Sequence, residues 1–336
     1  MLRQLTEKVL QKESATFAET HTALNDILSG QCNEIEIAGL LTALAARGET
    51  AEEIAGMAQA LRDHAVPVRP KISPVVDIVG TGGDGQSTFN ISTTAALVAA
   101  GAGVPIAKHG NRAITSQCGS ADLLAELGVK IDAAPATIER CIDQAGIGFM
   151  FAPNHHPAMK YVQPIRKALG FRTAFNILGP LANPAQAPIQ IIGVAKPHLL
   201  SVMAEALKLL GATRALVVHG DGTDEFTLSG PTDIVELRQG QISRHTIDYS
   251  DYGLSHAPLS ALTGGSLADN VKITRQILEN QTTGPCRDIV VFNAAAAIML
   301  SGKAPGFEEG ITRATDSIDS GRAQNTLEKF VEISHS

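Results

Sequence analysis

The sequence predicts an α/β protein with a small N-terminal all-helical domain and a larger domain that has a mostly parallel central sheet flanked by helices. Two patterns lead to this prediction. Apolar side chains in the first 66 residues recur at helical spacing, whereas strand-like and helix-like segments alternate after residue 75. A chain of 336 residues is long enough for one large domain and one small one.

Capping signals support the helical domain, which we place at residues 1–66. In the segment NEIEIAGLLTALAARGET, Asn33 can cap a helix with Glu36 three residues later, and a glycine closes the segment. Thr50 and Glu53 repeat the capping box for the next helix. The following stretch, AVPVRPKISP, contains three prolines, so residues 67–74 are the expected hinge.

Residues 75–336 are the expected α/β domain. VVDIVG and VPIAKHG predict two strands on either side of the helix STTAALVAAGAG. IQIIGVA and RALVVHG predict two more strands around the helix PHLLSVMAEALKLLGA, and RDIVVFNAAAAIML supplies a further strand signal. Ligands of such sheets bind beyond the carboxyl ends of the strands, where the glycine turn after VVDIVG and the KHG tripeptide are both expected.

Composition excludes several classes of function. The net charge of −7 and the lack of tryptophan disfavour nucleic acid as a partner. The four cysteines have neither disulfide-frame nor zinc-site spacing, which is typical of reduced thiols in the cytosol. No signal-peptide core and no membrane-spanning stretch is found, so we expect a cytoplasmic protein without a membrane partner.

The glycine-rich segment DIVGTGGDGQSTFNIST matches two common phosphate-binding patterns only in part. Three of its glycines fit the dinucleotide fingerprint, but no Asp or Glu occurs between Gly85 and Ala121 to hold a ribose. Gln86 stands where a P-loop would have its lysine. Neither an NAD site nor an ATP site is therefore predicted.

Small polar residues crowd the same segment and favour a compact phosphate monoester at a helix start. They are Thr81, Ser87, Thr88, Asn90, Ser92 and Thr93. An ordinary turn and helix cap would use the same residue types. Six of them together with Lys108 and Arg112 favour the phosphate site.

Other polar positions also have simple structural interpretations. Asp224 and Glu225 follow a predicted strand and form either a solvated turn or a site for Mg²⁺ that also binds phosphate. His155 and His156 are most simply loop residues. The simplest interpretation of Arg166 and Arg172 is that they are surface charges. However, the segment RTAFNILGPLANP contains too much glycine and proline for a plain helix.

Four long segments taken in order resemble the anthranilate phosphoribosyltransferase family of tryptophan biosynthesis. They are DIVGTGGDGQSTFNIST, KHGNRAITSQCGSADLLAELG, RKALGFRTAFNILGPLANP and VVHGDGTDEFT. The resemblance covers nearly the whole chain and implies a glycosyltransferase that binds 5-phosphoribosyl 1-diphosphate and anthranilate with Mg²⁺ as cofactor. It also implies a homodimer formed through the helical domain, which part of residues 165–188 would join.

The resemblance assigns site residues one by one. The 5-phosphoribosyl 1-diphosphate site would contain Gly80, Gly83, Asp84, Thr88, Asn90, Ile91, Ser92, Thr93, Lys108, His109, Gly110, Asn111, Arg112, Ala113, Ile114, Thr115, Ser116 and Ser120. Gly80, Asn111 and Arg166 would contact anthranilate, with Arg166 at its carboxylate. Ser92, Asp224 and Glu225 would bind the metal. Thr115 stands at a position where serine is common in the family, and both residues offer a hydroxyl group.

The expected chemistry needs neither a covalent nucleophile nor a general base. Displacement of diphosphate from C1′ passes through an oxocarbenium-like state, so the protein mainly neutralises the leaving group and orients the acceptor. An aromatic amine is already neutral at pH 7. Two other functions remain to be considered. A pyrimidine nucleoside phosphorylase has a similar fold but lacks a counterpart of the KHGNR segment followed by GSAD. A nucleic-acid-binding paralogue would need a basic groove, whereas this chain is acidic.

Overall fold

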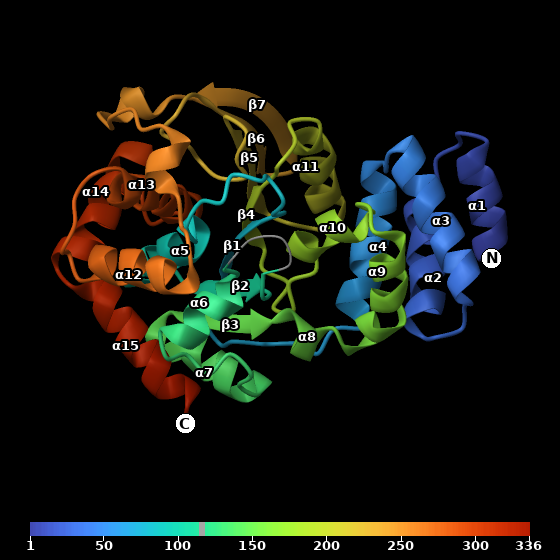
Figure 1. The fold of residues 1–336 in the computed structure, drawn as a ribbon, viewed down its shortest axis with the longest axis horizontal. Helices are drawn as coiled ribbons and strands as arrows, with labels where there is room; N and C mark the ends of the chain where they lie inside the picture. Colours follow the sequence, from blue (N-terminus) through green and yellow to red (C-terminus); the bar gives the residue numbers. More distant parts are fainter. Residues whose placement is uncertain (114–117) are drawn as a thin grey trace.

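The computed structural model describes residues 1–113 and 118–336. A bundle of helices at the N-terminal end lies beside a larger α/β part, and the C-terminus lies at the lower edge of that larger part (Figure 1). This arrangement confirms the predicted fold class.

Four helices build the bundle: α1 (Leu2–Leu10), α2 (Phe17–Leu28), α3 (Glu34–Arg47) and α4 (Ala51–Asp63). The predicted caps are present, because Asn33 accepts a hydrogen bond from the Glu36 N–H at 3.0 Å and Thr50 forms a complete capping box with Glu53. Two later helices, α9 (Gln163–Leu169) and α10 (Phe175–Leu178), pack against α3 and α4 respectively. The bundle therefore contains chain from two distant parts of the sequence.

A seven-stranded sheet in the order β3-β2-β1-β4-β5-β6-β7 forms the centre of the larger part. The strands are β1 (Val76–Gly80), β2 (Ile106–Gly110), β3 (Ile147–Phe151), β4 (Ile189–Gly193), β5 (Arg214–Gly220), β6 (Thr232–Arg238) and β7 (Gln241–Ile247). The first five pair in parallel, and β6 and β7 continue the sheet in antiparallel pairing.

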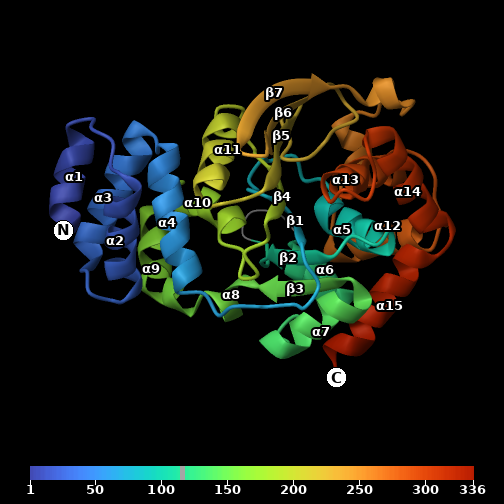
Figure 2. The same ribbon diagram turned by 180° about the vertical axis from the view of Figure 1, so that it is seen from behind.

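Helices cover both faces of the sheet (Figure 2). On one face, Leu216 and Val218 join a core with α5 (Ile91–Gly101), α13 (Pro285–Leu300), α14 (Phe307–Asp319) and α15 (Arg322–Ser334). On the other face, Val217 joins α11 (Leu199–Leu209) and the whole bundle in a second core. Successive residues of a strand point to opposite faces, so the middle of β5, residues 215–218, is apolar on both faces. The bundle is thereby anchored to one face of the sheet.

The remaining helices are short or peripheral. They are α6 (Ser120–Glu126), α7 (Pro135–Ala145), α8 (Ala152–His155) and α12 (Leu267–Leu278), with 3-10 turns η1 (Pro157–Tyr161), η2 (Gly179–Leu181), η3 (Tyr249–Tyr252) and η4 (Leu259–Leu262).

One expected strand is wrong. The segment RDIVVFNAAAAIML lies within helix α13, which starts at Pro285 and is buried on nearly every side between α5, α14 and the sheet. A helix buried all round shows no polar face, so its apolar run resembles that of a buried strand. Among the described residues, no helix combines the length and apolar character needed to cross a bilayer.

Candidate active site

Three neighbouring strands, β1, β4 and β5, end in glycines at one edge of the sheet. Gly80 pairs with Gly193, and Gly220 closes β5. The glycine loop after β1 therefore lies beside the turn that carries Asp224, whose Oδ2 accepts the Gly82 N–H at 2.7 Å. A Cβ at Gly193 would overlap the Asp224 carbonyl, so only glycine permits this approach. The structure thus brings the loop and the acidic pair together.

Of the two carboxylates, that of Glu225 faces the start of α5, whereas that of Asp224 contacts the glycine loop. The Ser92 N–H donates to Glu225 Oε1 at 3.2 Å. Burial raises the pKa of Asp224 to about 6, and the negative charge of Asp84 adds to this effect. Burial, with a further contribution from Asp224, raises the pKa of Glu225 well above its ordinary value. Such carboxylates gain free energy when a divalent cation replaces the proton, so the oxygen groups of Ser92, Asp224 and Glu225 fit Mg²⁺.

The helix start of α5 departs from an ordinary cap. The Asn90 side chain makes no capping bond; its Nδ2 donates to the Cys118 carbonyl at 3.0 Å instead. Thr88 forms a bridge with Thr263, and Ile91 and Thr93 are buried. The hydroxyl of Thr93 has no hydrogen-bond partner in the described part of the chain. The Thr93 hydroxyl is therefore the buried side-chain group at this helix start that still lacks a partner among the described residues.

The resemblance puts Lys108 in the 5-phosphoribosyl 1-diphosphate site, but the structure buries its side chain beneath the glycine loop. It is only 2% exposed, and its ammonium donates to the Ile78 carbonyl at 2.5 Å. Burial lowers its pKa, while Asp77 and Glu225 oppose that shift. Its charge therefore acts from beneath the loop, next to the acidic pair.

His109 is a neutral, oriented imidazole. Its Nδ1 contacts the Gly179 carbonyl at 3.2 Å, and because a carbonyl only accepts, Nδ1 carries the hydrogen. The Nε2 lone pair is buried without a partner in the described residues. Burial, with a further effect of His156, holds the pKa of His109 well below its ordinary value. This nitrogen can accept a hydrogen bond but is a weak base.

The rest of the KHGNR segment forms a compact turn onto α6. Arg112 pairs with Asp122 at 2.7 Å, and the Asn111 carbonyl accepts the Ser120 hydroxyl at 3.3 Å. The Ala113 N–H donates to Asp122 at 3.0 Å. A Cβ at Gly110 would overlap Ser120. The predicted residues Ile114, Thr115 and Ser116 lie outside the described residues.

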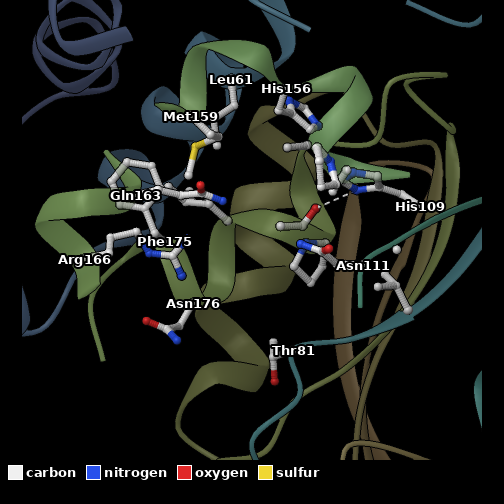
Figure 3. A pocket seen from close by; sticks show the side chains of 18 of the residues that line it. Leu61, Thr81, His109, Asn111, His156, Met159, Gln163, Arg166, Phe175 and Asn176 are labelled. Carbon is white, nitrogen blue, oxygen red and sulfur yellow. Dashed lines mark hydrogen bonds between the residues drawn. The ribbon is translucent and has the colours of Figure 1, made fainter. Parts of the chain in front are cut away.

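A cavity of about 380 Å³ separates the glycine loop from α9. Arg166 enters it from α9, with its guanidinium 5.5 Å from the centre of the Phe175 ring. Figure 3 shows Arg166 and Phe175 across the cavity from Asn111 and His109. Gly80 also lines it, so all three residues assigned to the acceptor meet here.

The sequence did not indicate the apolar part of this lining, nor the place of His156 in it. Leu61, Met159 and Phe175 give the cavity an apolar wall, and His156 lies edge-to-face with His109 at 5.1 Å between ring centres. His155 and His156 are both buried, and His155 Nδ1 contacts the Val66 carbonyl at 2.8 Å. The adjacent histidines in NHHPAMK were a signal, but adjacent polar residues are ordinarily found in exposed loops.

Comparison with known proteins extends over both parts of the chain. Residues 3–65 match the glycosyl transferase family, helical bundle domain, and residues 72–324 match the glycosyl transferase family, a/b domain. The anthranilate phosphoribosyltransferase of Chloroflexus aurantiacus is 50% identical over 335 residues, covering 99% of this chain and 98% of that protein.

Solved structures agree. The crystal structure of anthranilate phosphoribosyltransferase from Thermus thermophilus has a TM-score of 0.94, 44% identity and 99% coverage of both chains. The enzyme from Saccharomyces cerevisiae in complex with PRPP and Mg has a TM-score of 0.91 and 32% identity, covering 99% of this chain and 98% of its own. The chain belongs to the anthranilate phosphoribosyltransferase family, within the glycosyl transferases that pair a helical bundle with an a/b domain.

Proposed function

We propose that this protein transfers the phosphoribosyl group of 5-phosphoribosyl 1-diphosphate to the amine of anthranilate, giving N-(5-phosphoribosyl)anthranilate and diphosphate. This reaction is the second step of tryptophan biosynthesis from chorismate. The observation that carries the proposal is one apolar cavity with the glycine loop at one side and the Arg166 guanidinium at the other. Such a cavity suits an aromatic acceptor whose carboxylate meets the arginine while its amine faces the donor.

The donor side consists of the glycine loop, the start of α5 and the acidic turn. Asp224, Glu225 and Ser92 would hold Mg²⁺, because they offer hard oxygen atoms at the edge where phosphate groups are expected. These three residues supply fewer ligands than the octahedral shell of Mg²⁺ requires, so phosphate oxygens would complete the coordination. The bound ion would neutralise charge on the departing diphosphate.

The acceptor side orients the amine. Arg166 would bind the carboxylate, and Asn111 lies at the far wall nearer the loop. The His109 Nε2 lone pair would accept one amine hydrogen and so direct the nitrogen lone pair toward C1′. The low pKa of His109 suits orientation better than proton removal.

The bond changes balance without a covalent enzyme intermediate. The amine nitrogen attacks C1′ as the C1′–O bond to diphosphate breaks, so C1′ inverts. The new secondary ammonium loses one proton to solvent, and diphosphate leaves with the bonding electron pair. The protein lowers the barrier by holding both reactants in line and by stabilising the leaving charge.

Further features belong to the same proposal. The helical domain would span residues 1–66 with part of 165–188, the α/β domain 75–336, and the hinge 67–74; matches of the two family domains to residues 3–65 and 72–324 support this division. A homodimer through the bundle, which the resemblance to the family implies, is part of the proposal. A cytoplasmic location agrees with a biosynthetic role. Light scattering of purified protein tests the dimer.

The test of the reaction is product analysis. Purified protein with 5-phosphoribosyl 1-diphosphate, anthranilate and Mg²⁺ should yield equimolar N-(5-phosphoribosyl)anthranilate and diphosphate by mass spectrometry. Uridine with inorganic phosphate serves as the matched reaction for a nucleoside phosphorylase. Release of uracil without any conversion of anthranilate would overturn the proposal.

A further inference from the structure

Arg172 reaches from the segment between α9 and α10 to the glycine loop. Its Nη1 donates to the Gly83 carbonyl at 3.2 Å, and its Nη2 donates to the Gly82 carbonyl at 3.3 Å. Gly82 has a φ angle of 66° and Gly83 one of 73°, and this left-handed conformation turns their carbonyls toward the arginine. A Cβ at Gly83 would overlap Nη1, so the close approach depends on glycine. The guanidinium therefore lies directly on the loop assigned to the donor.

The other cations of the site already have partners or positions elsewhere. Lys108 is buried beneath the loop with its ammonium on Ile78, and Arg112 is paired with Asp122. Arg166 lies over Phe175 inside the cavity. Arg172, by contrast, is exposed, and in residues 1–113 and 118–336 it takes part in no ion pair within 4.0 Å.

The contacts that Arg172 makes are weak ones for a guanidinium. They use two of its five N–H donors, and both acceptors are neutral carbonyls. Hydrogen bonds between a guanidinium and phosphate oxygens are charge-assisted, bidentate and about twice as strong. An anion bound against Gly82 and Gly83 would therefore compete successfully for the same fork.

The negative charges around the glycine loop also favour a cation that binds diphosphate there. Asp84, Asp224 and Glu225 place three carboxylates around the loop, and the Asp224 Oδ2 lies against it, where it accepts the Gly82 N–H at 2.7 Å. A diphosphate that enters this site meets negative charge, which Mg²⁺ offsets only in part. A second cation at the outer side of the loop would complete the neutralisation.

We propose that Arg172 is a diphosphate-binding residue, which exchanges the carbonyls of Gly82 and Gly83 for oxygen atoms of the leaving group. This inference rests on the proposed function, because it concerns the donor of that reaction. Arg172 comes from the same α9–α10 segment as Arg166. We therefore expect Arg166 to bind the carboxylate of the acceptor and Arg172 to bind the diphosphate of the donor.

The experiment compares Arg172→Ala, Arg172→Lys and the wild type. Calorimetry measures the Kd of inorganic diphosphate with Mg²⁺, and initial rates give KM for each substrate separately. Loss of a charge-assisted pair of hydrogen bonds should weaken diphosphate binding about 10- to 100-fold in Arg172→Ala, with a parallel rise in KM for the donor. KM for anthranilate should stay within about twofold. Arg172→Lys should recover only part of the loss, since lysine lacks the planar fork.

Lys167→Ala is the matched control, because Lys167 is an exposed cation on α9 of the same segment. It should leave the diphosphate Kd unchanged. An unchanged Kd in Arg172→Ala would overturn the assignment and leave Arg172 a clamp for the loop, whatever the activity. A wild type that binds diphosphate but converts no anthranilate would overturn the proposed function alone. A wild type that binds no diphosphate would overturn both.

Discussion

Asp224→Asn should stabilise the metal-free protein while abolishing Mg²⁺-dependent activity. The pKa of Asp224 is raised from 3.8 to about 6 by burial and by Asp84. A raised carboxyl pKa stabilises the fold only below the unfolded pKa, and this contribution is lost as pH rises through about 6. The difference corresponds to about 3 kcal/mol at pH 7.5, and remaining solvent contact reduces the expected gain to about 1 to 3 kcal/mol. Asparagine keeps an oxygen for the Gly82 N–H.

Thermal unfolding in EDTA measures this effect. At pH 7.5 the variant should unfold several degrees above the wild type, and the gap should shrink as pH falls from 6 toward 4. Asp122→Asn provides the control of opposite sign, because backbone and Arg112 hydrogen bonds lower the pKa of Asp122 in spite of its burial. That exchange should destabilise the protein at pH 7.5. If Asp224→Asn were less stable than the wild type at pH 7.5, the Asp224 carboxylate would not destabilise the metal-free fold.

Three other predictions concern the same site. Arg166→Ala should raise KM for anthranilate about 10- to 100-fold with little change for the donor; an unchanged KM for anthranilate in steady-state kinetics would contradict the assignment. Gly193→Ala should displace the Asp224 turn, since its Cβ would overlap the Asp224 carbonyl; the Mg²⁺ concentration for half-maximal rate should rise, and an unaltered Mg²⁺ curve would count against it. In the wild type, that same concentration should rise as pH falls below about 6, because Asp224 takes up a proton; titrations at pH 5.5 and 7.5 check this, and identical curves would argue against metal binding by Asp224.

The fold was predictable where local patterns are unambiguous. Capping boxes and apolar spacing predicted the bundle helices, and short apolar runs before glycine predicted β1, β2, β4 and β5. The strand expected in RDIVVFNAAAAIML failed because α13 is buried on nearly every side and shows no polar face. Strands β3, β6 and β7 were not anticipated.

The candidate site was predictable at the motif level only. The glycine loop and Asp224 were expected at one edge, and parallel strands do bring them together. Side-chain direction was not predictable, because it depends on long-range packing. Lys108 donates to the carbonyl of Ile78, and Arg112 turns to Asp122 across a ten-residue separation. The apolar wall of the cavity comes from separate elements that no single motif joins.

The decisive measurement of the proposed transferase reaction is anthranilate fluorescence in the presence of the purified protein. We expect a decay that requires enzyme, 5-phosphoribosyl 1-diphosphate and Mg²⁺ together, and that does not occur when any one of them is left out. A folded protein with ligands in excess that leaves the fluorescence unchanged would contradict it.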